Sequence, residues 1–394
     1  MNKNLLDQAV QNYINASLSA DINQIALAKS RFEGITSGEL AEQITAKKKS
    51  EKKLPTWFNT PNIYYPPPLS IEQTSSEKTA KYKAKLVKGD SLIDLTGGFG
   101  VDSFYFAKET AEVIHCEINA ELSAIVTYNY ALLNAKNIQC YAENGIELIK
   151  NGVKQYGTVY IDPARRAEKG KVFMLKDCSP DVVSNLDTIL EKTSRIIIKT
   201  APLLDISAGL LELKFVSEIH IVSVKNECKE ILWVIDKDFN GTLKIIASTL
   251  NEIEKYFVFL KSEAEIPVDF IDNLAEQKYL YEPDVALLKS GAFNLIAKRY
   301  ELKKLHPQTQ LYASNNINRN FPGRIFEIKQ IILPKDLKKK EGVIGNVIVR
   351  NYPAKPEELV KKYKIKSAKE DFLIFTKTLN ENNVILRSQI VQYY

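Results

Sequence analysis

The stretch Leu92-Ile-Asp-Leu-Thr-Gly-Gly-Phe-Gly100 joins a short apolar run to a glycine-rich turn, with Asp94 where the two meet. An amphipathic segment follows, and a second apolar run, Glu112-Val-Ile-His-Cys116, leads to another carboxylate, Glu117. This order predicts a strand, a tight turn, a helix and a second strand, which is how a nucleotide-binding α/β sheet begins.

The alternation continues from Asp90 to Ile235 and predicts an α/β fold with a Rossmann-like, mostly parallel sheet of seven strands. Only Lys225–Lys229 separates the last two strands. They must form a terminal antiparallel hairpin, because a parallel return needs about a dozen residues. The predicted strands are 91–95, 112–116, 137–142, 157–162, 195–199, 217–224 and 230–236, and the predicted helices are 101–109, 119–134, 144–150, 179–192 and 203–213.

The segments on either side of this sheet have different patterns. Residues 1–46 show helical periodicity without proline and predict a helical N-terminal element, which Tyr64-Tyr-Pro-Pro-Pro-Leu69 follows as an extended segment. Residues 243–275 resemble further strands that lead away from the sheet. We therefore expect a helical region with a Pro-rich segment over 1–80, the sheet domain over 81–275 and a smaller α/β domain over 276–394.

Positive charge is concentrated in the last of these parts. The whole chain of 394 residues has a net charge of +6, whereas the segment from Glu276 onward holds 22 Lys and Arg against 12 Asp and Glu. A lysine-rich solvated face explains this excess, and so does a module that recruits a polyanion such as nucleic acid. Composition alone leaves both interpretations open.

Several classes of protein are disfavoured by the same composition. No apolar run approaches the ~20 residues of a membrane span, and the N-terminus lacks a signal-peptide pattern, so we expect a cytoplasmic protein without a membrane partner. The four cysteines and three histidines are dispersed, without a CxxC pair or a histidine cluster. Buried reduced thiols are therefore expected, and no metal site.

The acid before the glycine turn distinguishes two kinds of cofactor. A dinucleotide-binding turn holds a pyrophosphate and follows the spacing GxGxxG, whereas Ser103 stands here where the third glycine would be. A carboxylate at Asp94 would oppose a pyrophosphate but suits a ligand with a sulfonium or ammonium charge, such as S-adenosylmethionine. The predicted cofactor-binding residues of this turn are Asp94, Gly97, Gly98 and Gly100. An ordinary tight turn with helix-capping acids is the alternative.

Two further strand ends add candidate contacts to this cofactor. Glu117 lies 23 residues beyond Asp94, close to the roughly 20 residues expected for an acid that binds the ribose hydroxyls. Asn144 follows the third strand and could present a donor and an acceptor to the adenine edge. Lys199-Thr-Ala-Pro202 ends the fifth strand and could line the substrate side.

The fourth strand ends in Val159-Tyr-Ile-Asp-Pro-Ala-Arg-Arg166, which places a carboxylate and a stiff backbone beside the cofactor crevice. With Asp-Leu-Thr-Gly-Gly-Phe-Gly (94–100), Cys-Glu (116–117) and Ala-Glu-Asn (142–144), the region 90–235 resembles the class I S-adenosylmethionine-dependent methyltransferases. It is most similar to RNA methyltransferases whose fourth strand ends in Asp/Asn-Pro-Pro-x. The C-terminal part, with Tyr281-Glu-Pro-Asp284, is similar to the THUMP-like domain found beside such enzymes in bacterial proteins.

The resemblance implies S-adenosylmethionine as cofactor, Thr96 at the first glycine position of the family turn, and structured RNA (tRNA or rRNA) as substrate. It also implies that Asp162 and the Pro163 backbone orient the nucleophile. Ala164 replaces the family's second proline, and Arg165 replaces the aromatic residue that stacks on the base in amino-methylating members. Arg165 or Arg166 could instead stack on a base, hold a phosphate or pair with a carboxylate. The catalytic candidates are Asp162, Pro163 and Arg165.

Two other functions fit parts of the sequence. A nicotinamide-dependent oxidoreductase would share the α/β sheet, but Asp94 and the missing third glycine argue against it. A nucleic-acid-binding protein with a degenerate methyltransferase fold is the second alternative, and the presence of Asp94, Glu117 and Asp162 argues against it.

Overall fold

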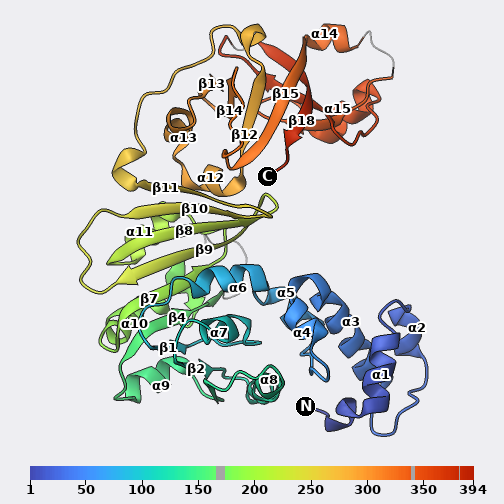
Figure 1. The fold of residues 1–394 in the computed structure, drawn as a ribbon, viewed down its shortest axis with the longest axis vertical. Helices are drawn as coiled ribbons and strands as arrows, with labels where there is room; N and C mark the ends of the chain where they lie inside the picture. Colours follow the sequence, from blue (N-terminus) through green and yellow to red (C-terminus); the bar gives the residue numbers. More distant parts are fainter. Residues whose placement is uncertain (166–173, 339–341, 381) are drawn as a thin grey trace. The chain divides into compact units, whose positions relative to one another are not determined.

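A computed structural model describes residues 1–165, 174–338, 342–380 and 382–394 of the chain. The chain divides into two compact units (Figure 1): unit 1 is Met1–Val216 with Trp233–Asn240, and unit 2 is Ser217–Leu232 with Gly241–Tyr394. Strand β9 (Glu227–Asp236) contributes residues to both units. None of the helices in the described ranges has the length and hydropathy that a membrane span needs.

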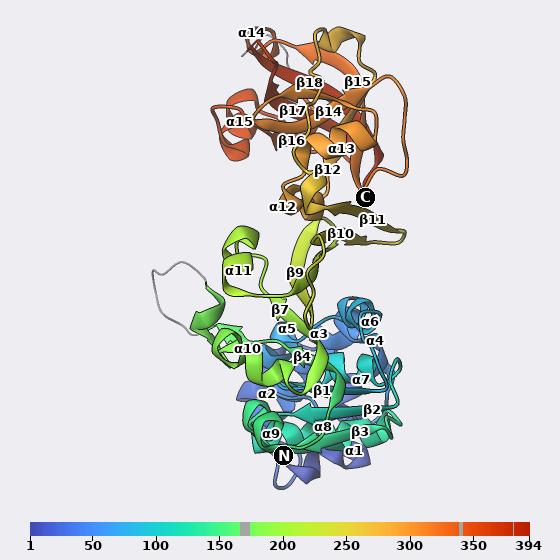
Figure 2. The ribbon, with the colours of Figure 1, turned by 90° about the vertical axis from the view of Figure 1, so that its left-hand side faces the viewer.

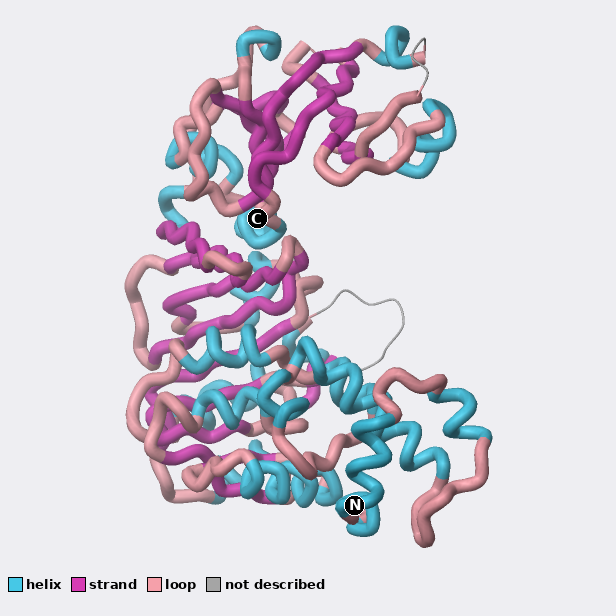
Figure 3. The backbone as a smooth tube through the Cα atoms, turned by 45° about the vertical axis from the view of Figure 1, so that its right-hand side comes forward, coloured by secondary structure: helices cyan, strands magenta, loops and turns pink. Residues whose placement is uncertain are grey.

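Unit 1 begins with helices, as the periodicity of residues 1–46 predicts (Figure 3). The longest of them starts at a capping box, in which Thr36 and Glu39 satisfy each other's backbone N–H groups. Trp57 and Tyr65 are buried in the core of unit 1. The helical N-terminal element is thereby confirmed. Its members are η1 (Lys3–Leu6), α1 (Gln8–Ala16), α2 (Ile22–Leu27), α3 (Ser37–Lys53), α4 (Pro55–Asn59), α5 (Pro68–Gln73) and α6 (Glu77–Ala84).

The predicted mostly parallel sheet is confirmed, and within the described residues it has nine strands in the order β11-β10-β8-β9-β7-β4-β1-β2-β3. In unit 1, β1 pairs in parallel with both β2 and β4, so the carboxyl ends of these strands meet at one edge. Figure 2 shows the strands of unit 1 between α7 on one side and α10 on the other. The strands are β1 (Ser91–Asp94), β2 (Glu112–Cys116), β3 (Ile138–Tyr141), β4 (Tyr156–Ile161), β7 (Thr193–Thr200), β8 (Val216–Val224), β9, β10 (Lys244–Leu250) and β11 (Glu254–Leu260).

The helices between these strands lie close to their predicted positions. They are α7 (Val101–Phe106), α8 (Ala120–Leu132), α9 (Gly145–Asn151), α10 (Val182–Leu190) and α11 (Ile206–Glu212), with a short pair β5 (Ala164–Arg165) and β6 (Cys178–Ser179) and the 3-10 turn η2 (Leu175–Asp177). The parallel strands β4 and β7 are buried along most of their length, which explains why they read as continuous apolar runs in the sequence.

The hairpin between β8 and β9 is tighter than predicted, and it does not end the sheet. Its turn is Lys225-Asn226, and both residues have positive φ (51° and 60°), as a two-residue hairpin turn requires. Strand β10 then pairs in parallel with β8, and β11 pairs antiparallel with β10. The expectation that residues 243–275 lead away from the sheet is therefore wrong. The backbone N–H and C=O groups of the buried strand β10 need hydrogen-bonding partners, and β8 provides them along one edge.

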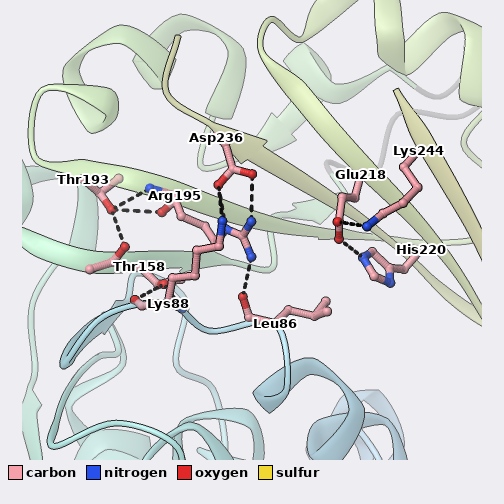
Figure 4. A network of polar contacts seen from close by, with 10 residues as sticks. Leu86, Lys88, Thr158, Thr193, Arg195, Glu218, His220, Asp236 and Lys244 are labelled. Carbon is pink, nitrogen blue, oxygen red and sulfur yellow. Dashed lines mark hydrogen bonds and ion pairs between the residues drawn. The ribbon is translucent and has the colours of Figure 1, made fainter. Parts of the chain in front are cut away.

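A buried arginine joins three parts of unit 1 (Figure 4). The Arg195 guanidinium on β7 donates two hydrogen bonds of 2.7 Å to the Asp236 carboxylate and one of 2.9 Å to the Leu86 carbonyl. The residue is 6% exposed. These bonds fix the end of β9 and the segment that leads into β1.

Replacing Arg195 by methionine should lower the free energy of unfolding of unit 1 by about 2–3 kcal/mol, because the Asp236 carboxylate loses two hydrogen bonds and keeps its ion pair with Lys88 (3.5 Å), and the Leu86 carbonyl loses the Arg195 donor. Both tryptophans, Trp57 and Trp233, lie in unit 1, so urea unfolding followed by tryptophan fluorescence reports on that unit. Lys154→Met is the control, since it breaks an exposed ion pair with Glu112 and should cost under about 1 kcal/mol. Equal losses for the two variants would contradict this account.

Unit 2 contains a second sheet, whose strand order in the described residues is β13-β14-β12-β15-β18-β17-β16. The pairings are antiparallel except for β16 and β17, which are parallel and joined through α15. The elements are η3 (Lys261–Glu263), η4 (Leu274–Glu276), β12 (Tyr279–Pro283), α12 (Val285–Ser290), α13 (Phe293–Arg299), β13 (Lys303–His306), β14 (Thr309–Ser314), β15 (Gly323–Ile332), α14 (Pro334–Leu337), β16 (Asn346–Val349), α15 (Pro356–Tyr363), β17 (Asp371–Lys377) and β18 (Asn383–Gln392).

Candidate active site

The glycine turn lies between β1 and α7, and each glycine has its own role. At Gly97, an added Cβ would lie 2.0 Å from Cε1 of His115, so the turn passes directly over this buried ring. Gly98 has φ of +56°, and a Cβ there would meet nothing closer than 3.9 Å. At Gly100, φ is +78° and a Cβ would lie 2.2 Å from the Tyr130 hydroxyl. Gly97 and Gly100 are therefore required by packing, while Gly98 leaves open space above the turn.

Asp94 holds the turn from inside. Its carboxylate accepts hydrogen bonds from the Thr96 N–H (3.0 Å) and from the Ser103 hydroxyl (2.6 Å), and the residue is 1% exposed. Burial raises the pKa of Asp94 to about 7; these two hydrogen bonds oppose the rise, and the nearby carboxylates of Asp102 and Asp162 add to it. The Asp94 carboxylate is therefore buried beneath the turn, and its charge changes near neutral pH.

Glu117 and Asn144 lie at the ends of the next two strands. The Glu117 carboxylate accepts the N–H of Gly98 (2.9 Å) through one oxygen and the N–H of Asn119 (2.8 Å) through the other. Each oxygen keeps a further lone pair, so this half-buried carboxylate can still accept hydroxyl groups. Asn144 caps α9, where its Oδ1 accepts the N–H of Ile146 (2.9 Å). The cap uses the carbonyl oxygen of the Asn144 amide, and the side chain is otherwise exposed.

Asp162 follows β4 at the same edge of the sheet. Its backbone N–H donates to the Thr96 hydroxyl (2.6 Å), which joins the end of β4 to the glycine turn. Its carboxylate forms an ion pair with the Lys199 ammonium near the end of β7. Pro163 is buried beside it. Arg165 belongs to β5 and its backbone pairs with Cys178, whereas Arg166 lies outside the described residues.

Sequence reasoning gave no role to two buried residues under the turn. Ser103 was noted only as a missing glycine, yet its hydroxyl contacts both the Asp94 carboxylate and Nδ1 of His115 (3.2 Å). His115 is 0% exposed, and burial lowers its pKa to about 4, so its ring is neutral. The only sequence signal was a histidine inside a buried apolar strand that follows the glycine turn.

A buried ion pair fixes the first turn of α7 to the helix before β1. The Lys83 ammonium, on a fully buried side chain of α6, lies 3.1 Å from the Asp102 carboxylate, which also accepts the hydroxyls of Ser75 (2.7 Å) and Tyr160 (3.0 Å). Burial would raise the pKa of Asp102, but Lys83 and Lys199, together with the Ser75 hydrogen bond, hold it below its usual range. This arrangement keeps α7, and therefore the turn that precedes it, in a fixed place.

The structure thus brings most of the predicted residues to one edge of the unit 1 sheet. Direct contacts join Asp94, Thr96 and Asp162 in one chain, and a separate contact joins Gly98 to Glu117. Asn144 is tied to the same edge through Gly145, where a Cβ would lie 2.5 Å from the carbonyl of Leu95. Among the described residues, no group of three or more His, Cys, Asp or Glu is placed to hold a metal ion.

The sheet order, the glycine turn and the acids at the strand ends define a methyltransferase-like fold of class I. Two family models match unit 2: residues 279–322 match a ferredoxin-like domain, and residues 323–388 match a THUMP domain-like family. The resemblance to class I methyltransferases with a C-terminal THUMP-like domain is confirmed. A search of the curated proteins finds no match.

One solved structure matches the whole chain. It is described as a "putative methyltransferase from Porphyromonas gingivalis W83" and is 30% identical to this chain. The match covers 98% of this chain and 98% of that one, with a TM-score of 0.85. The chain belongs to the family of that protein. Matches to part of the chain include a Streptococcus mutans protein in complex with SAH (14% identity, 41% of this chain and 96% of that one, TM-score 0.31) and an rRNA methylase from Streptococcus thermophilus (14%, 40% and 94%, TM-score 0.30).

Proposed function

We propose that the protein is an S-adenosylmethionine-dependent methyltransferase that acts on structured RNA, tRNA or rRNA. The observation that carries the proposal is the arrangement at the strand ends: a Cβ on Gly98 would meet nothing closer than 3.9 Å, Glu117 accepts the Gly98 N–H, and the Asp162 N–H donates to Thr96 of the same turn. Open space in a glycine turn, a carboxylate with free lone pairs and a buried acid below suit an adenosyl ligand with a positive charge. The residues present therefore fit this cofactor.

The proposed cofactor contacts divide between backbone and side chains. The turn Thr96–Gly100 would lie against the methionine part, Glu117 would accept the ribose hydroxyls and Asn144 would lie near the adenine. Asp94 would act through its charge, since the residue is 1% exposed and lies beneath the turn that its oxygens hold. When bound, the cofactor supplies an activated methyl group with a neutral leaving group.

The chain's own contribution to the reaction is alignment and proton removal. Asp162 and the Pro163 backbone would orient the attacking nitrogen or oxygen, and the Asp162 carboxylate would accept its proton. Lys199 holds that carboxylate in place, and the Thr96 hydroxyl fixes its backbone. The role of Arg165 toward a base or a phosphate stays a prediction from the sequence, because its side chain lies outside the part that the structure describes.

The RNA substrate is supported by unit 2, whose basic residues and THUMP domain-like match are found together. Nucleoside mass spectrometry of RNA from cells with and without the gene tests this proposal. One methylated nucleoside should be lost from tRNA or rRNA without the gene, and return with the wild-type chain but not with Asp162→Asn. Identical nucleoside profiles in both strains would count against RNA as the substrate.

Cofactor affinity should depend on pH because of Asp94. Its pKa of about 7 means that the carboxylate is ionised above neutral pH and protonated below it. A cation is favoured only by the ionised form, so the Kd of S-adenosylmethionine should be about tenfold higher at pH 6 than at pH 8. S-adenosylhomocysteine, which lacks the sulfonium charge, is the control and should change less. Titration calorimetry that shows the same pH profile for both ligands would rule out a role for this charge.

A further inference from the structure

A polar hollow in unit 2 lies beside the loop between β14 and β15. Its volume is about 510 Å³, which is in the range of ligand sites of roughly 300–1,000 Å³. The loop sequence is Asn315-Asn-Ile-Asn-Arg-Asn-Phe-Pro322. The hollow is lined by Tyr300, Glu301, Ser314, Asn316, Ile317, Asn318, Arg319 and Asn320.

Side chains from β12 and β11 hold the backbone of this loop in place. The Tyr281 hydroxyl, on a residue that is 0% exposed, donates to the carbonyl of Asn316 (2.6 Å) and accepts the N–H of Asn318 (2.8 Å). The Lys255 ammonium donates to the carbonyls of Arg319 (2.6 Å) and Phe321 (3.0 Å). The loop backbone is therefore pre-organised, whereas Asn316, Arg319 and Asn320 have exposed side chains. Tyr281 of the Tyr281-Glu-Pro-Asp284 segment is one of the residues that fix this backbone.

The chemistry of the lining is that of a base-reading surface. Three carboxamides, Asn316, Asn318 and Asn320, line the hollow, and carboxamide donors and acceptors match the edges of nucleobases. The Asn318 oxygen already accepts the N–H of Asn320 (3.1 Å), so Asn318 contributes mainly its amide donor. Burial raises the pKa of Tyr300 to about 12, so its hydroxyl stays protonated as a donor at neutral pH. Arg319 and Glu301 are the charged groups of the lining and have opposite signs. A lining without net charge disfavours a free polyphosphate and suits a neutral base.

We propose that this hollow binds one unpaired base of the RNA. The inference rests on the proposed function in one respect, namely that the substrate is RNA. Carboxamides on a pre-organised loop give selectivity for the base, while the excess of Lys and Arg in residues 276–394 gives affinity for the backbone. Unit 2 would then select RNA by an unpaired nucleotide, separately from the nucleotide that is methylated in unit 1.

The test is fluorescence anisotropy of the full chain with a labelled single-stranded RNA of twelve nucleotides and with the same sequence as a duplex. In Asn316→Leu/Asn320→Leu, both carboxamides are lost without a change of charge. Affinity for the single strand should fall about tenfold, with the salt dependence and the duplex affinity unchanged. Asn382→Leu is the control, since Asn382 is exposed in unit 2 and is not among the residues that line the hollow.

Tyr281→Phe provides a second variant, because it removes only the hydroxyl that holds the loop. It should weaken single-strand binding by less than the double variant does. The melting temperature of the C-terminal sheet should stay within a few degrees of the wild-type value. Unchanged single-strand affinity in the double variant would overturn the inference while leaving RNA methylation intact. Equal losses for single strand and duplex would also overturn it, because the hollow would then contact the backbone. A wild-type chain that methylates no RNA would instead contradict the proposed function.

Discussion

Replacing Asp162 by asparagine should lower kcat for methyl transfer by about 100-fold or more, while the Kd for S-adenosylmethionine stays within about twofold. The amide cannot accept the proton of the nucleophile, and removal of a general base typically costs 10²–10⁴-fold. The backbone N–H of residue 162 still donates to the Thr96 hydroxyl in the variant, so the glycine turn keeps its place. Single-turnover transfer and titration calorimetry measure the two quantities separately.

Two comparison variants sharpen this experiment. Asp187→Asn removes an exposed carboxylate of unit 1 that pairs with Lys214, and it should leave both quantities unchanged. Lys199→Met should lower kcat by less than Asp162→Asn, because it removes the partner that orients the carboxylate but keeps the carboxylate itself. Parallel losses of transfer and cofactor binding in Asp162→Asn would show that Asp162 serves the turn and takes no part in the chemistry.

The second large effect is expected at Gly97. Gly97→Ala should destabilise unit 1 by about 3 kcal/mol and abolish measurable cofactor binding, because the new methyl group would overlap the buried His115 ring, 2.0 Å away. Gly98→Ala meets no such neighbour and should cost only about 1 kcal/mol through its positive φ. Tryptophan fluorescence in urea reports both changes.

His115→Ala combined with Gly97→Ala identifies the cause of the loss. If the overlap is responsible, removing the ring makes room for the methyl group, and the double variant should be less destabilised than the sum of the two single variants. Additive losses in this double-mutant cycle would mean that backbone strain, and not contact with His115, requires a glycine at this position.

The first half of the fold was predictable from the sequence because its signals are local. Strands such as β2 and β4 are buried apolar runs bounded by charged residues, and Gly100 marks the start of α7. In unit 2, α15 begins at Pro356, and proline is a local signal for the first turn of a helix. The strands β12 to β15 were not predicted, because β12 pairs with β14 and β15, which lie far from it in the chain.

The candidate site was predictable at the strand ends but not in its internal contacts. Asp94, Glu117 and Asp162 follow apolar runs, and parallel strands bring their carboxyl ends to one edge. The pairing of Asp162 with Lys199, and of Asp102 with the buried Lys83, depends on the order of strands and on helix packing. A lysine in a polar stretch such as Glu77–Lys88 gives no sign that its ammonium group is buried.

The central claim is tested most directly by transfer of a labelled methyl group from S-adenosylmethionine to total cellular RNA by the purified full chain. We expect label in tRNA or rRNA, none in DNA or protein, and none with Asp162→Asn at an equal degree of cofactor binding. A wild-type chain that binds S-adenosylmethionine but transfers no label to RNA, DNA or protein would contradict the claim. It would then favour a nucleic-acid-binding protein with a degenerate methyltransferase fold.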